Sequence, residues 1–596
     1  MNQRLSPESI AAARLADPSS RNRIDVPRVT DWKAVLAILL QNKVPLLGLE
    51  HDPALADSPL AQMPEFQRAA AGHEARWRGF RDEYELVRNR LLDRDIRGIL
   101  FKSAGVAPSF PFTSDNLDFL VKPEYIEQGR EVLLDLGYVE LRNVEEPLKL
   151  LFRKFNGGES VSAIHLHGTV GWGVPFMDDD ALWRRIRESA DDPLVLVPGP
   201  EDALLVNIAH AFYEDKSLKL LDLVRIRHCL RAADIDYDDV ERIARERGWV
   251  DGLAFCLLLF DRIEELAYGE RSLPPEVSER ARGIVSRDRW LARRLERTLE
   301  REEVRFPFYV SFLFGKTVYY RKILHDSRRR PLTRMGDVFR TLVWGAKLKL
   351  GIRGQRGMIV SFSGIDGSGK TAHIEPLKRA FKTCDIITRI HWSRFGSSAG
   401  TPAAPGGPDP SATSDTATSY ARRRRRLANP ALRIGWLLFN MLKYVFGCLI
   451  QVRIPKALGK VVICDRYYHD AAVEIGASLP GNRWLARQAE RILRSLCPRP
   501  GIAWLLDVPA AVSVERQPDE RRSGKAREEL ERQREAYRAM APLHNLRTVE
   551  TDRGLQDTTN RVVRETLRIY YHDYHTWTNA LLLSNPDQMN PPGGTR

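Results

Sequence analysis

Eight consecutive residues, GIDGSGKT at Gly364–Thr371, form the clearest chemical pattern in the chain. They fit the spacing G-x-x-x-x-G-K-[ST], in which glycines allow successive backbone N–H groups to curl around a triphosphate without Cβ clashes. A strand-like run, Met358–Phe362, precedes the loop and a helical pattern, Ala372–Phe381, follows it. The positive end of that helix dipole favours an anion at the same place. We therefore expect a nucleoside-triphosphate site with ATP and Mg²⁺ as cofactors, formed by Gly364, Ile365, Asp366, Gly367, Ser368, Gly369, Lys370 and Thr371.

The last two residues of this pattern, and residues downstream of it, supply groups that phosphoryl transfer requires. Lys370 is expected to hold the β- and γ-phosphates, and the Thr371 hydroxyl is expected to bind Mg²⁺. Asp465 ends the apolar run VVICD, where a carboxylate is placed to hold the metal or a water, and Arg466 and Tyr467 follow it.

A charged stretch after the next apolar run, Ile502–Val508, has two interpretations. One is a solvated helix supported by pairs such as Glu528 with Arg532. The other is a mobile lid that brings cations over the transferring phosphoryl group and excludes water. We expect the helix after Ala526 to be solvated and the preceding cations to act, namely Arg516, Arg521, Arg522 and Lys525.

Together, GIDGSGKT, the DRY at Asp465–Tyr467, WLLDVPAAVSVER at Trp504–Arg516 and the lid with QREAY resemble the thymidylate kinase family of nucleoside monophosphate kinases. The resemblance covers most of Met358–Tyr571. It implies a P-loop NTPase fold, with helices on both faces of a parallel sheet, and ATP-dependent phosphorylation of a nucleotide such as dTMP. It also implies that Asp366 approaches the nucleoside sugar and that Asp465 and Arg466 serve metal and phosphate. Lid arginines are expected to stabilise transition-state charge, because Gly367 stands where some relatives carry Arg. The family is usually homodimeric.

The acceptor side departs from that family. Its R-E-P-G-G segment is replaced by TRIHWSRFGSS, which leaves Arg389 and Arg394 as candidates for the acceptor phosphate. Its base-reading Phe and Arg correspond to Phe439 and Lys443. Thymidylate, another nucleotide and a phosphorylated sugar therefore all stay open as acceptors. The aromatic DRYYHD is similar to proteins associated with bacterial polysaccharide synthesis. The alternative function is accordingly a catalytically weak ATP-binding regulatory or scaffold protein in that process.

The apolar stretch Ile434–Val452 is long enough to span a membrane, and Arg422–Arg426 precede it as an inside-facing anchor would. However, Arg433, Asn440, Lys443, Gly447 and Gln451 share one narrow stripe at helical spacing. We therefore expect a helix buried in the kinase-like domain, with its polar stripe toward substrate or solvent. Peripheral association with the inner membrane face is the alternative.

Two segments of the N-terminal half, TSDNLDFLVK at Thr113–Lys122 and SAIHLHGTVGW at Ser162–Trp172, resemble an uncharacterised nucleotidyltransferase family of the polymerase-beta type. The resemblance covers roughly Ala34–Leu266 and implies an α+β domain with a helical extension. In that family a D-x-D pair and a third carboxylate hold Mg²⁺, but here Asn116 stands at the first of these positions and His165 at the third. Either the site is degenerate and binds without catalysis, or Asp118, His165 and His167 hold a transition metal.

Composition excludes global disorder and a disulfide framework. The chain has 596 residues, 43% of them hydrophobic, and six scattered cysteines without a C-x-x-C pair. Lys plus Arg minus Asp plus Glu gives 92 − 78 = +14, which favours anionic partners. We expect a nucleotide or phosphorylated small molecule rather than specific nucleic-acid binding, since no nucleic-acid recognition motif is present. The N-terminus lacks the apolar core of a signal peptide, so we expect a cytoplasmic protein.

Composition shifts predict the domain order of this α/β protein. The expected regions are a nucleotidyltransferase-like domain at 1–197, a helical domain at 198–300, a basic aromatic linker at 301–357, a thymidylate kinase-like domain at 358–575 with a disordered insert at 396–419, and a flexible tail at 576–596.

Overall fold

The computed structural model describes most of the chain. The described residues are 5–49, 52–55, 58–101, 116–141, 149–172, 174–189, 193, 195–232, 235–300, 304–349, 356–393, 395, 430–479, 482–516, 524–552 and 554–582. The expected disordered insert at 396–419 lies outside the described residues. Of the expected flexible tail at 576–596, residues 576–582 instead continue the helix Leu555–Leu582, and the remainder lies outside the described residues.

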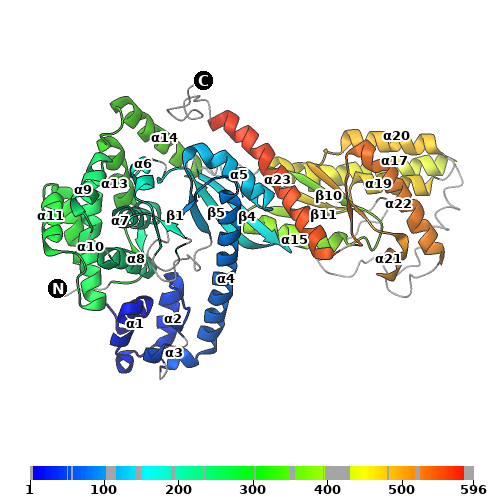
Figure 1. Ribbon diagram of the computed structural model, residues 1–596. Helices are drawn as coiled ribbons and strands as arrows, with labels where there is room; N and C mark the ends of the chain where they lie inside the picture. Colours follow the sequence, from blue (N-terminus) through cyan, green and yellow to red (C-terminus); the bar gives the residue numbers. More distant parts are fainter. Residues whose placement is uncertain are drawn as a thin grey trace. The chain divides into compact units, whose positions relative to one another are not determined.

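The chain divides into two compact units. Unit 1 comprises Met1–Arg153 and Ser162–Leu350, and unit 2 comprises Lys154–Val161 and Gly351–Gln588. Helices and strands are mixed in both, which confirms the expected α/β class (Figure 1).

The main sheet of unit 1 has the strand order β1-β2-β5-β4-β3. Its central strands, β2 and β5, pair in parallel, whereas β1 with β2 and β3 with β4 pair antiparallel. The strands expected near 96–101 and 117–121 are both present as short, fully buried segments. The strands are β1 Ile99–Leu100, β2 Leu117–Leu120, β3 Val139–Leu141, β4 Lys149–Asn156 and β5 Glu159–His167.

Helices cover this sheet and form the rest of unit 1. They include α1 Pro7–Ala16, α2 Trp32–Gln41, α3 Pro59–Gln62, α4 Pro64–Leu92, α5 Ile126–Asp135 and α6 Asp179–Arg184. Residues 198–300 are helical as expected, apart from the two-residue strand β8, Ser217–Leu218. That region contains α7 Pro200–Ala209, α8 Leu220–Ala232, α9 Tyr237–Glu246, α10 Val250–Tyr268, α11 Pro275–Ser286 and α12 Arg289–Leu299. A further small pair joins β6 Arg187–Glu188 to β7 Leu196–Val197.

The segment expected as a linker contains regular structure. Strand β9, Phe308–Tyr309, pairs with β8, and α13, Phe312–His325, and α14, Pro331–Lys349, follow it. Phe314 and Val318 of α13 are buried in the unit 1 core. Their burial explains why the aromatic residues of this segment form a helix that packs on unit 1.

Unit 2 is built on a five-stranded parallel sheet. Its strands lie in the order β11-β12-β10-β13-β14, and every neighbouring pair is parallel. The strands are β10 Ile359–Ser363, β11 Thr388–Trp392, β12 Val461–Asp465, β13 Ile502–Asp507 and β14 Arg547–Glu550. Because all five run the same way, their carboxyl ends meet at one edge of the sheet.

Helices lie on both faces of this sheet, as parallel strands require (Figure 1). On one face, Ile359, Val462 and Cys464 pack with α17, Pro430–Cys448, α19, Tyr468–Ser478, and α20, Arg483–Leu496. On the other, Trp504 of β13 donates a 3.0 Å hydrogen bond to Thr566 of α23, Leu555–Leu582, which packs beside α15, Lys370–Thr383. Helices α18 Ile454–Ala457, α21 Ala510–Glu515 and α22 Gly524–His544 complete the unit.

Helix α17 differs from the sequence expectation. Its buried side consists of Leu437, Met441, Tyr444 and Cys448, and much of the remaining apolar surface faces solvent. The segment Leu432–Ala457 has the length and hydropathy of a membrane span, and 33% of its apolar window is buried. The expectation that α17 is buried except along its polar stripe was therefore wrong, because only one side of α17 packs into the core and its exposed side is largely apolar.

Candidate functional site

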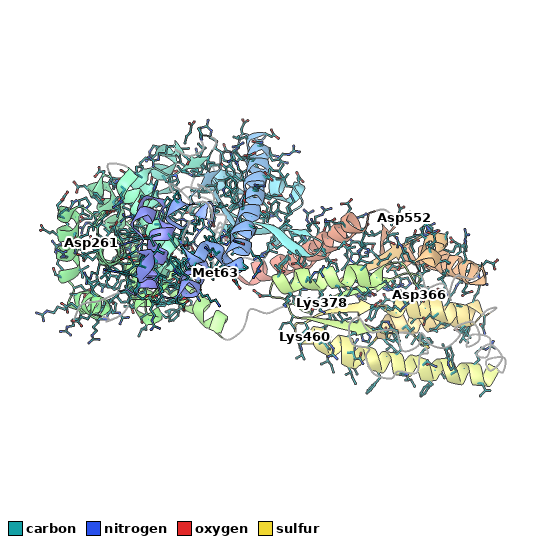
Figure 2. The ribbon with its side chains drawn as sticks, turned by 90° about the horizontal axis from the view of Figure 1, so that it is seen from below. Met63, Asp261, Asp366, Lys378, Lys460 and Asp552 are labelled. Atoms are coloured by element: carbon teal, nitrogen blue, oxygen red, sulfur yellow. The ribbon has the colours of Figure 1, made fainter. Side chains whose placement is uncertain are left out.

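The loop Gly364–Gly369 joins β10 to α15 at the carboxyl edge of the parallel sheet of unit 2. Gly364 has a φ of +148° and Gly367 a φ of +80°, a region that side chains disfavour. A Cβ atom at Gly364 would lie 2.5 Å from the Leu506 carbonyl oxygen, and one at Gly367 would lie 2.8 Å from that of Ser513. The glycines therefore allow the loop to lie close against the ends of β13 and α21. Figure 2 marks Asp366 in this loop and Lys378 in the following helix.

Lys370 begins α15 and turns back toward the loop. Its Nζ donates hydrogen bonds to the carbonyl oxygens of Gly364, at 3.0 Å, and Ile365, at 2.9 Å. Burial lowers the pKa of Lys370, and the nearby Arg466 charge acts in the same direction. The next residue, Thr371, is exposed at the first turn of the helix. A buried cation and an exposed hydroxyl thus stand together at the amino end of α15.

Asp465 ends β12, beside the end of β10, with which it pairs through Phe362. Its Oδ1 atom is buried and has no hydrogen-bond partner among the described residues. Burial raises the pKa of Asp465, although the charges of Lys370 and Arg466 oppose that change. A buried carboxylate oxygen without a donor fits a cation ligand, because its desolvation is otherwise uncompensated.

Arg466 follows Asp465 and links two further carboxylates. Its guanidinium pairs with Asp366 of the loop and lies 3.7 Å from Asp470 of α19. Its backbone nitrogen donates to the Phe362 carbonyl at 3.0 Å, and its φ is +72°. The strand therefore ends in a turn that holds Arg466 against the loop.

Asp470 connects three elements around this arginine. It accepts hydrogen bonds from Ser363 of β10 at 2.7 Å and from Tyr537 of α22 at 2.7 Å. It also accepts from the backbone of Tyr467, which caps α19. Sequence reasoning missed this role, although an acid three residues after the start of a helix is a capping signal.

Of the four cations expected in the lid, the structure describes the side chain of one, Arg516. Arg516 donates to the Thr551 carbonyl at 2.9 Å and to the Gly367 carbonyl at 3.4 Å, so it lies beside the loop. Arg521 and Arg522 lie outside the described residues, and only the backbone of Lys525 is described, in α22. Sequence reasoning also missed two arginines of α22, Arg534 and Arg538, which pair with Asp507 at 2.7 and 2.6 Å.

The proposed acceptor residues do not gather at the loop. Arg389 lies on the edge strand β11 opposite Val462, three positions before the strand end. Phe439 and Lys443 are exposed on the outer side of α17, and Arg394 lies outside the described residues.

One residue that sequence reasoning did not identify, Ser393, contacts Arg466, and a second, Tyr444, contacts Ser393. Ser393 follows β11, and its hydroxyl donates to the Arg466 carbonyl at 3.2 Å. The same hydroxyl lies 3.3 Å from that of Tyr444, on the buried side of α17. A serine just after a strand and a tyrosine within a helix carry no distinctive spacing, so the sequence holds no signal for this contact.

A second polar cluster lies in unit 1, where β2 and β5 pair in parallel. This register places Asp118 opposite His165 and Leu120 opposite His167. The Asp118 Oδ1 atom lies 3.3 Å from His165 Nδ1 and 3.0 Å from His167 Nε2. All three ligand atoms lie within 4.8 Å of one another. The expected juxtaposition of the two histidines on one strand face is therefore present.

Neighbouring groups complete this cluster. Asn116 Nδ2 donates to Asp118 Oδ2 at 2.8 Å and lies 3.1 Å from His165 Nδ1. The Phe101 ring packs edge-on against His167, with centroids 4.8 Å apart. Arg225 of α8 is buried, and its Nε atom has no hydrogen-bond partner in the part of the chain that the structure describes. Burial lowers the pKa of Arg225, while the charges of Asp222 and Asp118 oppose that change.

Comparison with known proteins bears on unit 1. No curated protein matches the chain. The model of a family described as uncharacterised nucleotidyltransferase matches residues 29–263, a range that contains the Asp118 cluster, the helices α2 to α9 and most of α10. The N-terminal part of this chain is therefore nucleotidyltransferase-like, that is, similar to a family of transferases.

Proposed function

We propose that unit 2 is an ATP- and Mg²⁺-dependent phosphotransferase of the nucleoside monophosphate kinase type, resembling thymidylate kinase and having a P-loop NTPase fold. The acceptor is dTMP, another nucleotide or a sugar phosphate. One observation carries the proposal. Lys370, Asp465 and Arg466 converge at the carboxyl edge of a parallel sheet, beside a glycine loop that opens a helix. Such a convergence supplies the cations and the metal ligand that phosphoryl transfer requires.

In this mechanism the chain chiefly positions groups and neutralises charge. Backbone N–H groups of the loop and Lys370 bind the triphosphate. Thr371 and Asp465 would hold Mg²⁺, which supplies charge neutralisation on the phosphate oxygens when bound. Arg466 and Arg516 stabilise the charge that develops as an acceptor oxygen displaces ADP from the γ-phosphorus. The bound acceptor phosphate is already ionised, so no strong general base is needed.

The decisive test measures ADP release by the full chain. Purified protein is given ATP, Mg²⁺ and a panel of nucleoside monophosphates and sugar phosphates. We expect one acceptor class to stimulate ADP release, and Lys370→Ala to reduce it by about 10²- to 10³-fold. Lys378→Ala is the matched control, because Lys378 lies on the same helix and, among the described residues, pairs with nearby Glu375 at 3.5 Å.

Other outcomes have distinct meanings. ATP binding without acceptor-dependent turnover across the whole panel would support the alternative, an ATP-binding regulatory or scaffold protein in polysaccharide synthesis. No ATP binding in the presence of Mg²⁺ would refute both functions for unit 2.

A second candidate function concerns unit 1, where we propose that Asp118, His165 and His167 hold a transition metal. Ligand atoms bound at about 2.1 Å around one metal lie about 3.0–3.4 Å apart. The two Asp118–histidine distances, 3.3 and 3.0 Å, match that separation. Two imidazoles and one carboxylate favour Zn²⁺, Fe²⁺ or Mn²⁺ over Mg²⁺, which prefers oxygen ligands.

Metal analysis of the dialysed full chain tests this centre. We expect the protein to retain a transition metal after equilibration with Zn²⁺, Fe²⁺ or Mn²⁺, and His165→Gln to abolish that retention. His210→Gln is the matched control, because His210 is another partly buried histidine of unit 1 and pairs with Glu214. Equal retention by both variants would exclude the cluster as the metal site.

A further inference from the structure

The outer side of α17 exposes large apolar side chains. Leu442 is 71% exposed, Phe439 67% and Phe446 63%, and all three lie within two helical turns. The opposite side of the same helix is packed into the core. A continuous row of exposed rings and aliphatic groups is unusual on a soluble surface and marks an interaction site.

Helix α20 extends this surface. Ala489 and Leu493 of α20 are buried in the same apolar cluster as Leu437 and Met441 of α17. The two helices therefore turn their other sides away from that cluster, and Figure 1 shows them side by side. On α20 the exposed apolar residues include Trp484, at 69% exposure. Hereafter the outer face means ten exposed apolar residues of α17, the following turn Leu449–Arg453, α18 and α20, namely Leu438, Phe439, Leu442, Phe446, Leu449, Ile450, Ile454, Trp484, Ile492 and Leu496.

The charged side chains of the helices that carry the outer face are cations with one exception. Residues 430–457 contain no Asp or Glu, and their cations are Arg433, Lys443, Arg453 and Lys456. Helix α20 adds Arg483, Arg487, Arg491 and Arg494. The only acid of α20, Glu490, is engaged by His544 at 2.6 Å. Apolar residues, a tryptophan and cations without exposed acids form the pattern of a helix that lies at a lipid interface.

This charge pattern discriminates between occupants. A second copy of the chain that docked through the same face would bring the cations of two identical surfaces together. Like charges across an interface oppose association. An anionic lipid surface instead attracts each Lys or Arg near it and accepts the apolar side chains into its acyl boundary.

We propose that the outer face docks unit 2 onto the surface of an anionic lipid bilayer. The helices lie in the plane of the membrane and do not cross it, because the buried side of α17 is held by the sheet. The proposal is independent of phosphoryl transfer, since the outer face contains none of the residues beside the loop.

Vesicle flotation of the full chain tests the proposal, because aggregated protein sediments while bound protein floats. We expect flotation with vesicles of phosphatidylcholine and phosphatidylglycerol in equal parts, and none with phosphatidylcholine alone. Added salt is expected to weaken the binding, since it screens the attraction. The double variant Phe439→Ser with Phe446→Ser should weaken binding at least about tenfold, because each ring contributes buried apolar area.

Two controls make the result specific. Leu543→Ser removes an apolar side chain that is equally exposed, at 70%, but lies on α22, and it should float like the unaltered chain. Arg487→Gln with Arg491→Gln leaves the apolar residues intact and should still weaken binding to the anionic vesicles, because two cations that attract anionic lipid are removed. Unchanged flotation of both double variants would overturn the proposal. It would also be overturned if the chain failed to float and light scattering showed a dimer that the phenylalanine variant dissociates, since the face would then be a self-association surface.

Discussion

Arg466 shows how one residue combines backbone strain with charge. Its positive φ is disfavoured for a side-chain-bearing residue, yet its guanidinium is held by Asp366 and Asp470. Burial would lower the pKa of Arg466, but these two carboxylates outweigh that effect and raise it. The ion pairs therefore fix a backbone conformation that the residue would not choose alone.

Two substitutions of Arg466 separate these contributions. Arg466→Gly and Arg466→Ala both remove the guanidinium, and both should abolish acceptor-dependent ADP release. Only glycine adopts the left-handed conformation without steric cost, so we expect the glycine variant to be more stable by about 1 kcal/mol. Urea denaturation of the two variants measures this difference. Equal stabilities would mean that the backbone relaxes when the side chain is lost.

His469 is a buried titratable group that the phosphoryl site does not use. Both of its ring nitrogens lack hydrogen-bond partners within the described part of the chain. Burial, together with the charges of His544 and Arg494, lowers the pKa of His469 to about 3. The folded state thus keeps His469 neutral, and the unfolded state takes up the proton first as the pH falls below 6.5.

This asymmetry predicts an acid-sensitive fold. Between about pH 7.5 and about pH 5, His469 should lower the free energy of unfolding by about 1–2 kcal/mol. His469→Phe should remove that part of the pH dependence, as measured by urea denaturation at both pH values. His572→Gln, at an exposed position of the same unit, should leave it unchanged. An unaltered pH dependence in His469→Phe would contradict this account.

At the scale of elements, helix α22 is attached to the sheet by charge. Asp507 at the end of β13 pairs with Arg534 and Arg538 of that helix. Burial raises the pKa of Asp507, but the hydrogen bonds from these arginines outweigh it and lower the pKa overall. The stabilisation is therefore present above pH 3.8, the ordinary value, and is lost as the pH falls through the lowered one.

Removing this carboxylate should loosen α22. We expect Asp507→Asn to lower the free energy of unfolding by about 1–3 kcal/mol, because two arginines lose their partner. Limited trypsin digestion should then cut faster within α22. Arg532→Gln is the control, since it breaks only an exposed pair with Glu529 and should change neither measurement. Unchanged cleavage in Asp507→Asn would show that apolar contacts alone hold the helix.

The sequence predicted elements whose pattern is local. The strand–loop–helix around Lys370, the strand ending at Asp465 and the shared face of His165 and His167 all follow from spacing along one segment. Contacts between distant segments carried no such signal. Asp470 accepts a hydrogen bond from Tyr537, and Asp507 forms ion pairs with arginines of α22. Both contacts exist only because the fold brings α22 next to the sheet.

The outcome for α17 has the same cause. Periodicity identified a polar stripe on an apolar helix and predicted that the stripe faces substrate or solvent, but the side that faces solvent is instead largely apolar. Asn440, a member of that stripe, is buried, whereas Phe439 is exposed. Which side is covered depends on the tertiary contacts of Leu437 and Tyr444, and these require the neighbouring elements.

At the scale of the whole molecule, two compact units with separate cores should unfold separately. Calorimetry is expected to show two transitions, of which only one moves upward with ATP and Mg²⁺. At about 100 times the dissociation constant, the ligand should add about 2.7 kcal/mol to the stability of unit 2. In Lys370→Ala that shift should vanish, with both transitions still present. A joint shift of both transitions would mean that the units unfold together.

The composition of residues 430–457 has a consequence for how the protein folds during its synthesis. On the ribosome this acid-free segment emerges before β12 and α20, whose residues Val462, Cys464 and Leu493 later cover one side of it. For an interval of the order of several seconds the nascent chain therefore exposes a segment with the length and hydropathy of a membrane span. The yield of native protein is therefore expected to depend on how quickly translation delivers β12 and α20, which cover one side of this segment.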